Sequence, residues 1–199
     1  MTAMVPEKIL DARTANFGIG HLLASAGFDH RSEYDPDAVW LFDTILPPFQ
    51  RGVEWDEAMM VRFIESIWMG MDIGRNVVND AQDAPGAGTR AGGKPLWHPS
   101  DRWLIDGQQR LTAIHRYVSD RFPIVGADGI PHLWSELPKV DQRHFASRQF
   151  DRGITSIHNE LDLRILYDRM NYGGMRHRED QRALPDGEPD GWTPAPGMR

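Results

Sequence analysis

The chain has 199 residues, of which 40% are hydrophobic and 26% charged, a composition typical of a globular domain and unlike that of a disordered protein. Its formal net charge of -7 argues against a surface built for indiscriminate binding to duplex DNA, which depends on Lys and Arg contacts to phosphates. The chain has no cysteine, no signal-peptide pattern and no apolar run long enough to cross a bilayer, so we expect a cytoplasmic protein without a membrane partner.

The first half of the chain predicts two helices and a strand. Residues 17–26 suit a short helix, and the proline-rich stretch 40–52 suits an extended or turn-rich connection. A second helix is expected from an N-cap at Asp56 to Gly70, because apolar residues recur there every three or four positions. Residues 76–79 favour a strand. The buried stripe of the second helix is predicted to consist of Met59, Met60, Phe63, Ile64, Ile67 and Trp68.

Residues 83–93 are rich in Ala, Gly and Pro, which predicts a mobile surface loop or lid. The loop overlaps an apparent P-loop, since Gly88, Gly93 and Lys94 have the spacing of that motif. We reject this interpretation because Pro95 stands where a P-loop needs Ser or Thr to hold magnesium. In addition, no apolar strand precedes the glycines and no helix follows them.

A short apolar strand followed at once by a polar helix start is the most informative segment. Residues 102–105 fit a buried strand, and helical periodicity begins at Gly107. The first turn of a helix has unpaired N–H groups and a partial positive charge, so a phosphate binds favourably beside it. Gly107 lets the backbone approach such a ligand closely, and Arg110 offers a charged, two-pronged contact to phosphate oxygens.

The polar side chains around this turn suit phosphoryl chemistry. Asp106 could bind Mg²⁺ or accept a proton from an attacking hydroxyl, and the amides of Gln108 and Gln109 could orient water or phosphate. The same residues also fit an ordinary capped helix, in which Asp106 is the N-cap and Arg110 pairs with a nearby acid. Spacing alone leaves both interpretations open.

The remaining segments complete an α+β pattern. Residues 122–125 and 153–157 favour strands, residues 141–150 a short amphipathic helix, and residues 161–170 a firmer helix. The apolar positions that we expect this last helix to bury are Leu161, Leu163, Ile165, Leu166 and Met170. The histidines do not fall into a compact metal-binding spacing, so we interpret His115, His177 and the neighbouring Glu179 as structural or solvated side chains.

Three segments resemble the DUF262 family, the nucleotide-hydrolysing part of GmrSD-type, modification-dependent restriction systems within the ParB/sulfiredoxin superfamily. Residues 104–114 look like the family signature around the Asp-Gly-Gln-Gln-Arg motif. Residues 46–55 resemble the upstream Pro, aromatic, Gln-Arg and Trp motif, and residues 65–70 resemble the end of the helix after it. Residues 166–174 resemble the helix-ending Arg, Asn and glycine segment. The matches follow the order of the family from residue 46 to about residue 183.

The resemblance implies an α+β fold with a small mixed sheet, surrounding helices and a turn that binds nucleotide phosphates. Gln50 and Arg51 would form a second polar edge of the pocket, and Arg169 and Asn171 are further candidates for binding the nucleotide. A simpler interpretation of Gln50 and Arg51 is that they cap the next helix and pair with Glu54. The phosphate-binding and catalytic roles are implied for Asp106, Gly107, Gln108, Gln109 and Arg110.

We therefore predict one domain over residues 1–183, with an uninformative segment at 1–39 and a flexible Pro- and Gly-rich tail at 184–199. The expected function is to bind and hydrolyse a nucleoside triphosphate, or to transfer its phosphoryl group, with Mg²⁺ and in connection with DNA restriction, modification or its evasion.

The sequence leaves two alternatives to this function open. The first is a non-catalytic nucleotide-sensing, DNA-binding module that regulates a separate nuclease subunit. The second is a DNA nickase, against which stands the lack of clustered carboxylates for a two-metal site. Many family members carry a C-terminal nuclease domain with a His-Asn-His metal site, which this chain is expected to lack.

Overall fold

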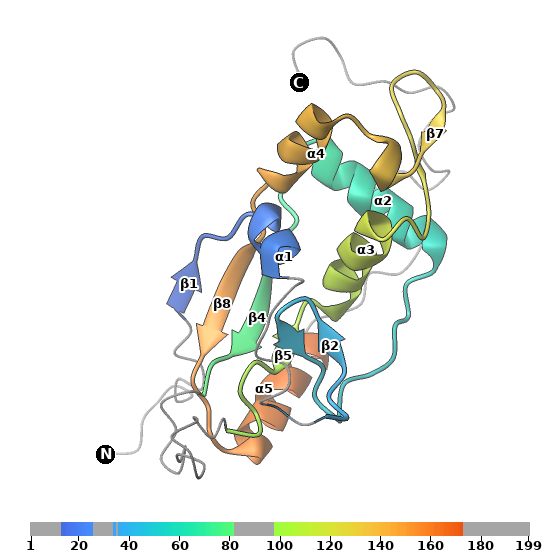
Figure 1. Cartoon of the computed structure of the whole chain (residues 1–199). Helices are drawn as coiled ribbons and strands as arrows, with labels where there is room; N and C mark the ends of the chain where they lie inside the picture. The colour runs from blue at the N-terminus through green and yellow to red at the C-terminus, as the bar shows by residue number, and fades with distance from the viewer. Residues whose placement is uncertain (1–12, 26–33, 35, 82–97, 173–199) are drawn as a thin grey trace, which may run out of the picture.

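The computed structural model describes residues 13–25, 34, 36–81 and 98–172 of the chain. This part combines a four-stranded mixed sheet, two small two-stranded sheets and five α-helices, so the predicted α+β class is confirmed (Figure 1). The elements are β1 (Arg13–Ala15), α1 (Ile19–Ser25), β2 (Trp40–Leu41), β3 (Thr44–Ile45), α2 (Glu57–Trp68), β4 (Arg75–Asn79), β5 (Leu104–Asp106), α3 (Gln108–Val118), β6 (Ile124–Val125), β7 (Pro131–His132), the 3₁₀ helix η2 (Trp134–Glu136), α4 (Lys139–Ala146), β8 (Asp151–Thr155) and α5 (Glu160–Tyr172).

The main sheet has the strand order β1-β8-β4-β5, with a parallel β4–β8 pair between two antiparallel pairs. Asn76 of β4 is the register partner of Arg152 in β8, and Val77 is the partner of Asp106 in β5. The β4–β5 register shifts between Val77 and Val78, next to the point where β5 ends. Strand β5 therefore delivers Asp106 to the end of the sheet and leads directly into α3.

Two clusters of buried apolar side chains lie on opposite faces of β5. Because side chains alternate along a strand, Leu104 joins a large cluster with helices α1 to α4, whereas Ile105 joins a second cluster with α5. Figure 1 shows α2, α3 and α4 grouped together and α5 on the other side of β5. A strand that is covered on both faces requires continuous apolar residues, which is why residues 103–105 do not alternate with polar ones.

Helix α2 begins and ends as predicted. The Asp56 side chain accepts a hydrogen bond of 2.7 Å from the Met59 N–H, and Gly70 follows the helix with a positive φ of 78°. Its buried stripe is narrower than expected, because Met60, Ile64 and Ile67 are buried while Phe63 and Trp68 are only partly buried. The prediction for Met59 was wrong, since its side chain is 43% exposed.

The last helix shows the same kind of difference. Leu163 and Leu166 are buried in α5, and Met170 packs against them. The predictions for Leu161 and Ile165 were wrong, because these side chains are exposed. Positions two residues before and after Leu163 are rotated about 200° around the helix axis, so they point away from the sheet.

Other boundaries moved by a few residues. The helix expected at 141–150 is α4, which ends at Ala146, and the strand expected at 122–125 is reduced to β6. The strand expected at 153–157 is β8, which starts two residues earlier. The loop at 83–93 with its P-loop look-alike, the tail at 184–199, and His177 with Glu179 all lie outside the described residues.

No helix in the described ranges is both long and apolar enough to cross a membrane. The described ranges also leave out parts of the predicted domain at 1–183, so its boundaries stay a prediction.

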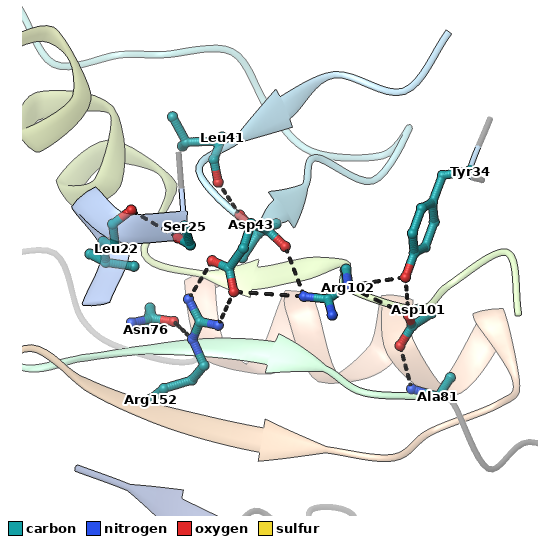
Figure 2. A network of polar contacts seen from close by, with 11 residues as sticks. Leu22, Ser25, Tyr34, Leu41, Asp43, Asn76, Ala81, Asp101, Arg102 and Arg152 are labelled. Carbon is teal, nitrogen blue, oxygen red and sulfur yellow. Dashed lines mark hydrogen bonds and ion pairs between the residues drawn. The ribbon is translucent and has the colours of Figure 1, made fainter. Parts of the chain in front are cut away.

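A buried ion pair that the sequence did not predict joins the β2–β3 hairpin to β8. The two Nη atoms of Arg152 contact the two carboxylate oxygens of Asp43 at 2.7 and 2.9 Å, and both residues are 6% exposed (Figure 2). Burial on its own raises the pKa of Asp43, but the hydrogen bonds and charge of Arg152, with the charge of Arg102, outweigh burial and lower the pKa.

We expect Asp43→Asn to lower the free energy of unfolding by about 3 kcal/mol near neutral pH, because Arg152 keeps its charge in the core without a carboxylate. A carboxylate whose pKa is lower in the folded than in the unfolded protein stabilises the fold at every pH above the unfolded pKa. This stabilisation is lost as the pH falls through the folded pKa. The stability of the wild type should therefore drop below about pH 4.

Urea unfolding at neutral pH and at acid pH measures both effects. The Asp43→Asn variant should show a weaker loss of stability in acid than the wild type, whereas the control Asp168→Asn, on the exposed side of α5, should keep the wild-type acid dependence. Equal acid dependence in Asp43→Asn and wild type would contradict the assignment.

Candidate functional site

A cavity of about 180 Å³ lies where β5 runs into α3. Two segments that are distant in sequence, residues 50–55 and 106–110, form its walls. The fold therefore brings together the two polar motifs that the sequence analysis singled out. The residues lining the cavity are Gln50, Arg51, Trp55, Asp106, Gly107, Gln108, Gln109 and Arg110.

The turn between β5 and α3 depends on a glycine. Gly107 is the N-cap of α3 and has a φ of 104°, in the left-handed region that favours glycine. A Cβ at this position would also lie 2.9 Å from the Cβ of Asn76, closer than carbon atoms pack. Asp106 is thus not the N-cap, and no side chain caps the first turn of α3. This uncapped end of the helix lines the cavity.

Asp106 and Arg110 form an ion pair at the cavity. Their Oδ2 and Nη2 atoms are 2.8 Å apart, so the acid that pairs with Arg110 is the predicted site residue itself. The Nη1 atom of Arg110 donates to the Ile73 carbonyl at 3.1 Å and lies against Gly74. These contacts hold the guanidinium in place before any ligand binds, and they leave Oδ1 of Asp106 without a hydrogen bond among the described residues.

Gln109 is a tether between the two walls of the cavity. Its Oε1 accepts hydrogen bonds from the backbone N–H groups of Glu54 and Trp55 at 3.0 and 3.1 Å, and its Nε2 donates to the Gly52 carbonyl at 3.2 Å. Both acceptor positions of Oε1 are therefore occupied by protein. The geometry supports a role for Gln109 in holding the 50–55 segment rather than in orienting a nucleophile.

Gln108 and Gln50 line the cavity, and the described residues do not use all of the hydrogen-bonding groups of their amides. Gln108 is only 7% exposed, and its side chain makes no hydrogen bond with the described residues. Gln50 donates from Nε2 to the Leu104 carbonyl at 3.3 Å, but its buried Oε1 has no partner. Because a buried polar atom without a hydrogen bond is costly, the unpartnered Oε1 of Gln50 favours a polar ligand in this cavity.

Arg51 and Trp55 complete the second wall. Arg51 forms an exposed ion pair of 3.1 Å with Glu54, so the simpler interpretation of this residue is correct in part, although Arg51 also lines the cavity. Gln50 does not cap α2, since Asp56 does. Trp55 was not predicted as a site residue. Its place in the motif at 46–55 was the signal that could have identified it.

Helix α5 supports this wall from behind. The Tyr167 hydroxyl accepts a hydrogen bond of 3.4 Å from the Arg51 N–H, and its ring is 5.4 Å from that of Phe49. Arg169 is exposed on α5 and does not line the cavity, so the structure does not bring this predicted residue to the site. Asn171 belongs to α5, but its side chain lies outside the described part.

Among the described residues, no group of three His, Asp or Glu side chains is placed to hold a metal ion. Asp106 has one carboxylate oxygen available beside the two Gln amides. This donor set does not fit a site that retains a metal by itself, but it fits Mg²⁺ that arrives with phosphate oxygens as its other ligands.

The family model for the N-terminal domain of GmrSD restriction endonucleases matches residues 33–181, well over half of the chain. The chain belongs to this family. Every residue that lines the cavity falls inside the match, and membership of the GmrSD N-terminal family links the protein to restriction systems. Searches of curated proteins and of solved structures gave no match. The ParB/sulfiredoxin-like core therefore stays a prediction.

We expect Gly107→Ala to destabilise this GmrSD N-terminal domain by about 2 kcal/mol or more, because a side chain there is strained at positive φ and also collides with Asn76. Gly129→Ala is the matched control, since Gly129 also has a positive φ of 76° but has nothing within 4 Å of an added Cβ. Thermal unfolding measures both. Equal losses would show that the contact with Asn76 is unimportant.

We expect Gln109→Ala to lower the free energy of unfolding by about 2 kcal/mol, because the N–H groups of Glu54 and Trp55 lose their acceptor. Gln109→Glu keeps the acceptor and loses only the donor to Gly52, so it should lie between Gln109→Ala and the wild type. Chemical denaturation gives the order of the three proteins. A Gln109→Ala variant with the free energy of unfolding of the wild type would contradict this role of Gln109.

Proposed function

We propose that the cavity binds the phosphate chain of a nucleoside triphosphate and that the domain hydrolyses it or transfers its terminal phosphoryl group. The observation that carries this proposal is a Gln108 side chain with no hydrogen bond among the described residues and a buried Gln50 Oε1 without a partner, both beside the guanidinium of Arg110 and the uncapped first turn of α3. A polyphosphate offers many acceptor oxygens and negative charge, which match the N–H donors and the cation of this site.

Each group has a distinct part in the proposed reaction. The N–H groups of the α3 first turn and Arg110 bind phosphate oxygens and stabilise the charge that develops as the terminal phosphoryl group leaves. Gln108 orients the attacking water or hydroxyl, because its amide is available and faces the cavity. Through Oδ1, Asp106 accepts a proton from the attacking water or hydroxyl or serves as a ligand to Mg²⁺. Gln109 keeps the 50–55 segment in place.

Mg²⁺ fits this site together with its nucleotide. Asp106 would hold it with phosphate oxygens, and Gln50 Oε1 is a second protein oxygen in the same cavity. When bound, Mg²⁺ would neutralise part of the phosphate charge. Trp55 is the one aromatic side chain among the lining residues of this cavity, so it is the surface on which a nucleobase would stack.

Family membership supports the setting that we propose for this activity. The matching model describes the N-terminal domain of a restriction endonuclease. We propose that nucleotide binding or turnover here is coupled to the restriction of DNA, including modified DNA, by a separate nuclease subunit. The net charge of -7 argues that contact with DNA uses a local surface instead of the whole molecule.

A second candidate function is nucleotide sensing without turnover. It is favoured by the Asp106–Arg110 ion pair, which occupies one of the two carboxylate oxygens of Asp106. In that case the same cavity binds nucleotide and the bound state regulates the nuclease. The two candidates differ only in whether the terminal phosphoryl group is cleaved from the nucleotide.

We expect the purified protein to bind nucleoside triphosphates with Mg²⁺ and to release phosphate, and we expect Gln108→Ala to lower kcat by about 10²-fold because an oriented hydrogen-bonding group is lost. Calorimetric binding and phosphate release, with ATP, GTP, CTP and UTP and with and without modified DNA, measure both steps.

Gln149→Ala is the control, since Gln149 is exposed and does not line the cavity, and it should behave as wild type. Binding that yields no nucleoside diphosphate, by hydrolysis or by phosphoryl transfer, would establish the sensing function. If none of the four nucleotides binds to the wild-type protein, the proposed function is wrong.

A further inference from the structure

We infer that Asn76 and Arg152 are positioning residues for the phosphate-binding turn, a role that rests on the proposed function of the cavity. Neither residue lines the cavity, and neither belongs to the motifs that the sequence analysis identified. Both lie in the main sheet, where they are register partners in the parallel β4–β8 pair, and Asn76 is in contact with Gly107. They connect the turn to the buried ion pair with Asp43.

The first step of this connection is the contact between Gly107 and Asn76. An added Cβ on Gly107 would lie 2.9 Å from the Cβ and 3.2 Å from the Cα of Asn76. The glycine backbone therefore rests on Asn76. Because Gly107 has no side chain, its backbone can pack directly against Asn76, and this contact sets the distance between the turn and β4.

The second step is the fixation of Asn76 from both sides. Its Nδ2 donates to the Asp151 carbonyl at 3.1 Å, and its Oδ1 accepts from Nε of Arg152 at 3.0 Å. Asn76 is completely buried, so water does not compete for these bonds. The amide consequently has one orientation, and the backbone at Gly107 packs against a fixed surface.

The third step is the fixation of Arg152. With Nε committed to Asn76, its two Nη atoms bind both oxygens of Asp43, and Figure 2 shows the guanidinium directed at the carboxylate with Asn76 at its side. Asp43 also lies 3.7 Å from Nη1 of Arg102, which joins it to Tyr34. The hydrogen bonds to Asn76 and Asp43 therefore fix the orientation of the Arg152 guanidinium.

The energetics favour positioning over stability as the reason for these buried charges. Replacing a buried ion pair by apolar side chains of similar size is often neutral or stabilising, so an apolar core would hold the fold as well. An apolar side chain at position 152 would not orient the Asn76 amide. A phosphate site needs its groups within about 0.5 Å of the productive geometry, and the network supplies that restriction.

The test uses the full chain with two independent variants. Asp43→Leu with Arg152→Met removes both buried charges together, and Asn76→Ala removes only the amide while it keeps the Cβ below Gly107. The control is Arg148→Met, because Arg148 is a part-buried arginine that donates to the Trp68 carbonyl at 3.2 Å and does not line the cavity.

The first readout needs no nucleotide. Hydrogen exchange by NMR follows the amide of Leu111, which donates to the Gly107 carbonyl, and those of Glu54 and Trp55, which donate to Gln109. In both test variants we expect these amides to exchange about tenfold faster than in the control, at similar thermal stability, because the turn is no longer held. Exchange equal to that of the control would overturn the inference.

The second readout is nucleotide turnover. We expect a higher KM for the nucleoside triphosphate in both test variants and a lower kcat, whereas Arg148→Met keeps wild-type values. Unchanged KM and kcat in folded test variants of an active protein would also overturn the inference. If the wild type binds no nucleotide, the proposed function fails, while the exchange measurement still decides whether Asn76 and Arg152 hold the turn.

Discussion

The close packing of the Gly107 backbone on Asn76 is the constraint on which the rest of this site depends. At that point the chain leaves β5 and enters α3, and the left-handed backbone of Gly107 lets Asp106 remain a strand residue while Gln108 already begins the helix. A Cβ at position 107 would lie too close to Asn76, so the turn or β4 would have to shift. The polar groups of the turn are thus gathered at one end of α3 because β4 lies directly below it.

The cavity has two walls that are held by different interactions. One wall, at 106–110, consists of the end of β5 and the start of α3, so it is joined directly to the main sheet. The other, at 50–55, has no regular structure and is held by Gln109 from one side and by Tyr167 and Phe49 from the other. The Gln109 amide is used within the protein, whereas the Gln108 side chain and Oε1 of Gln50 have no hydrogen-bond partner among the described residues.

Buried charge and site geometry are linked in this protein. The Asp43–Arg152 pair lies in the core, where apolar residues would pack as well, but it continues through Asn76 to the underside of Gly107. The proposed binding of a highly charged nucleotide would need a turn that is not displaced by the ligand. A network of directional hydrogen bonds resists such displacement better than apolar contacts, which have no preferred direction.

The sequence by itself determined the local features of this protein. Periodicity located α2 and α3, and the Asp56 cap located the start of α2. Continuous apolar residues located β5, and the polar cluster after them located the turn. All of these signals depend on neighbouring residues in the sequence. Tertiary structure alone decided which groups are available. It placed Gln109 against Glu54 and Trp55, set Arg169 apart from the cavity, and brought Asn76, Arg152 and Asp43 together. These relations join residues far apart in the chain, so no local pattern records them.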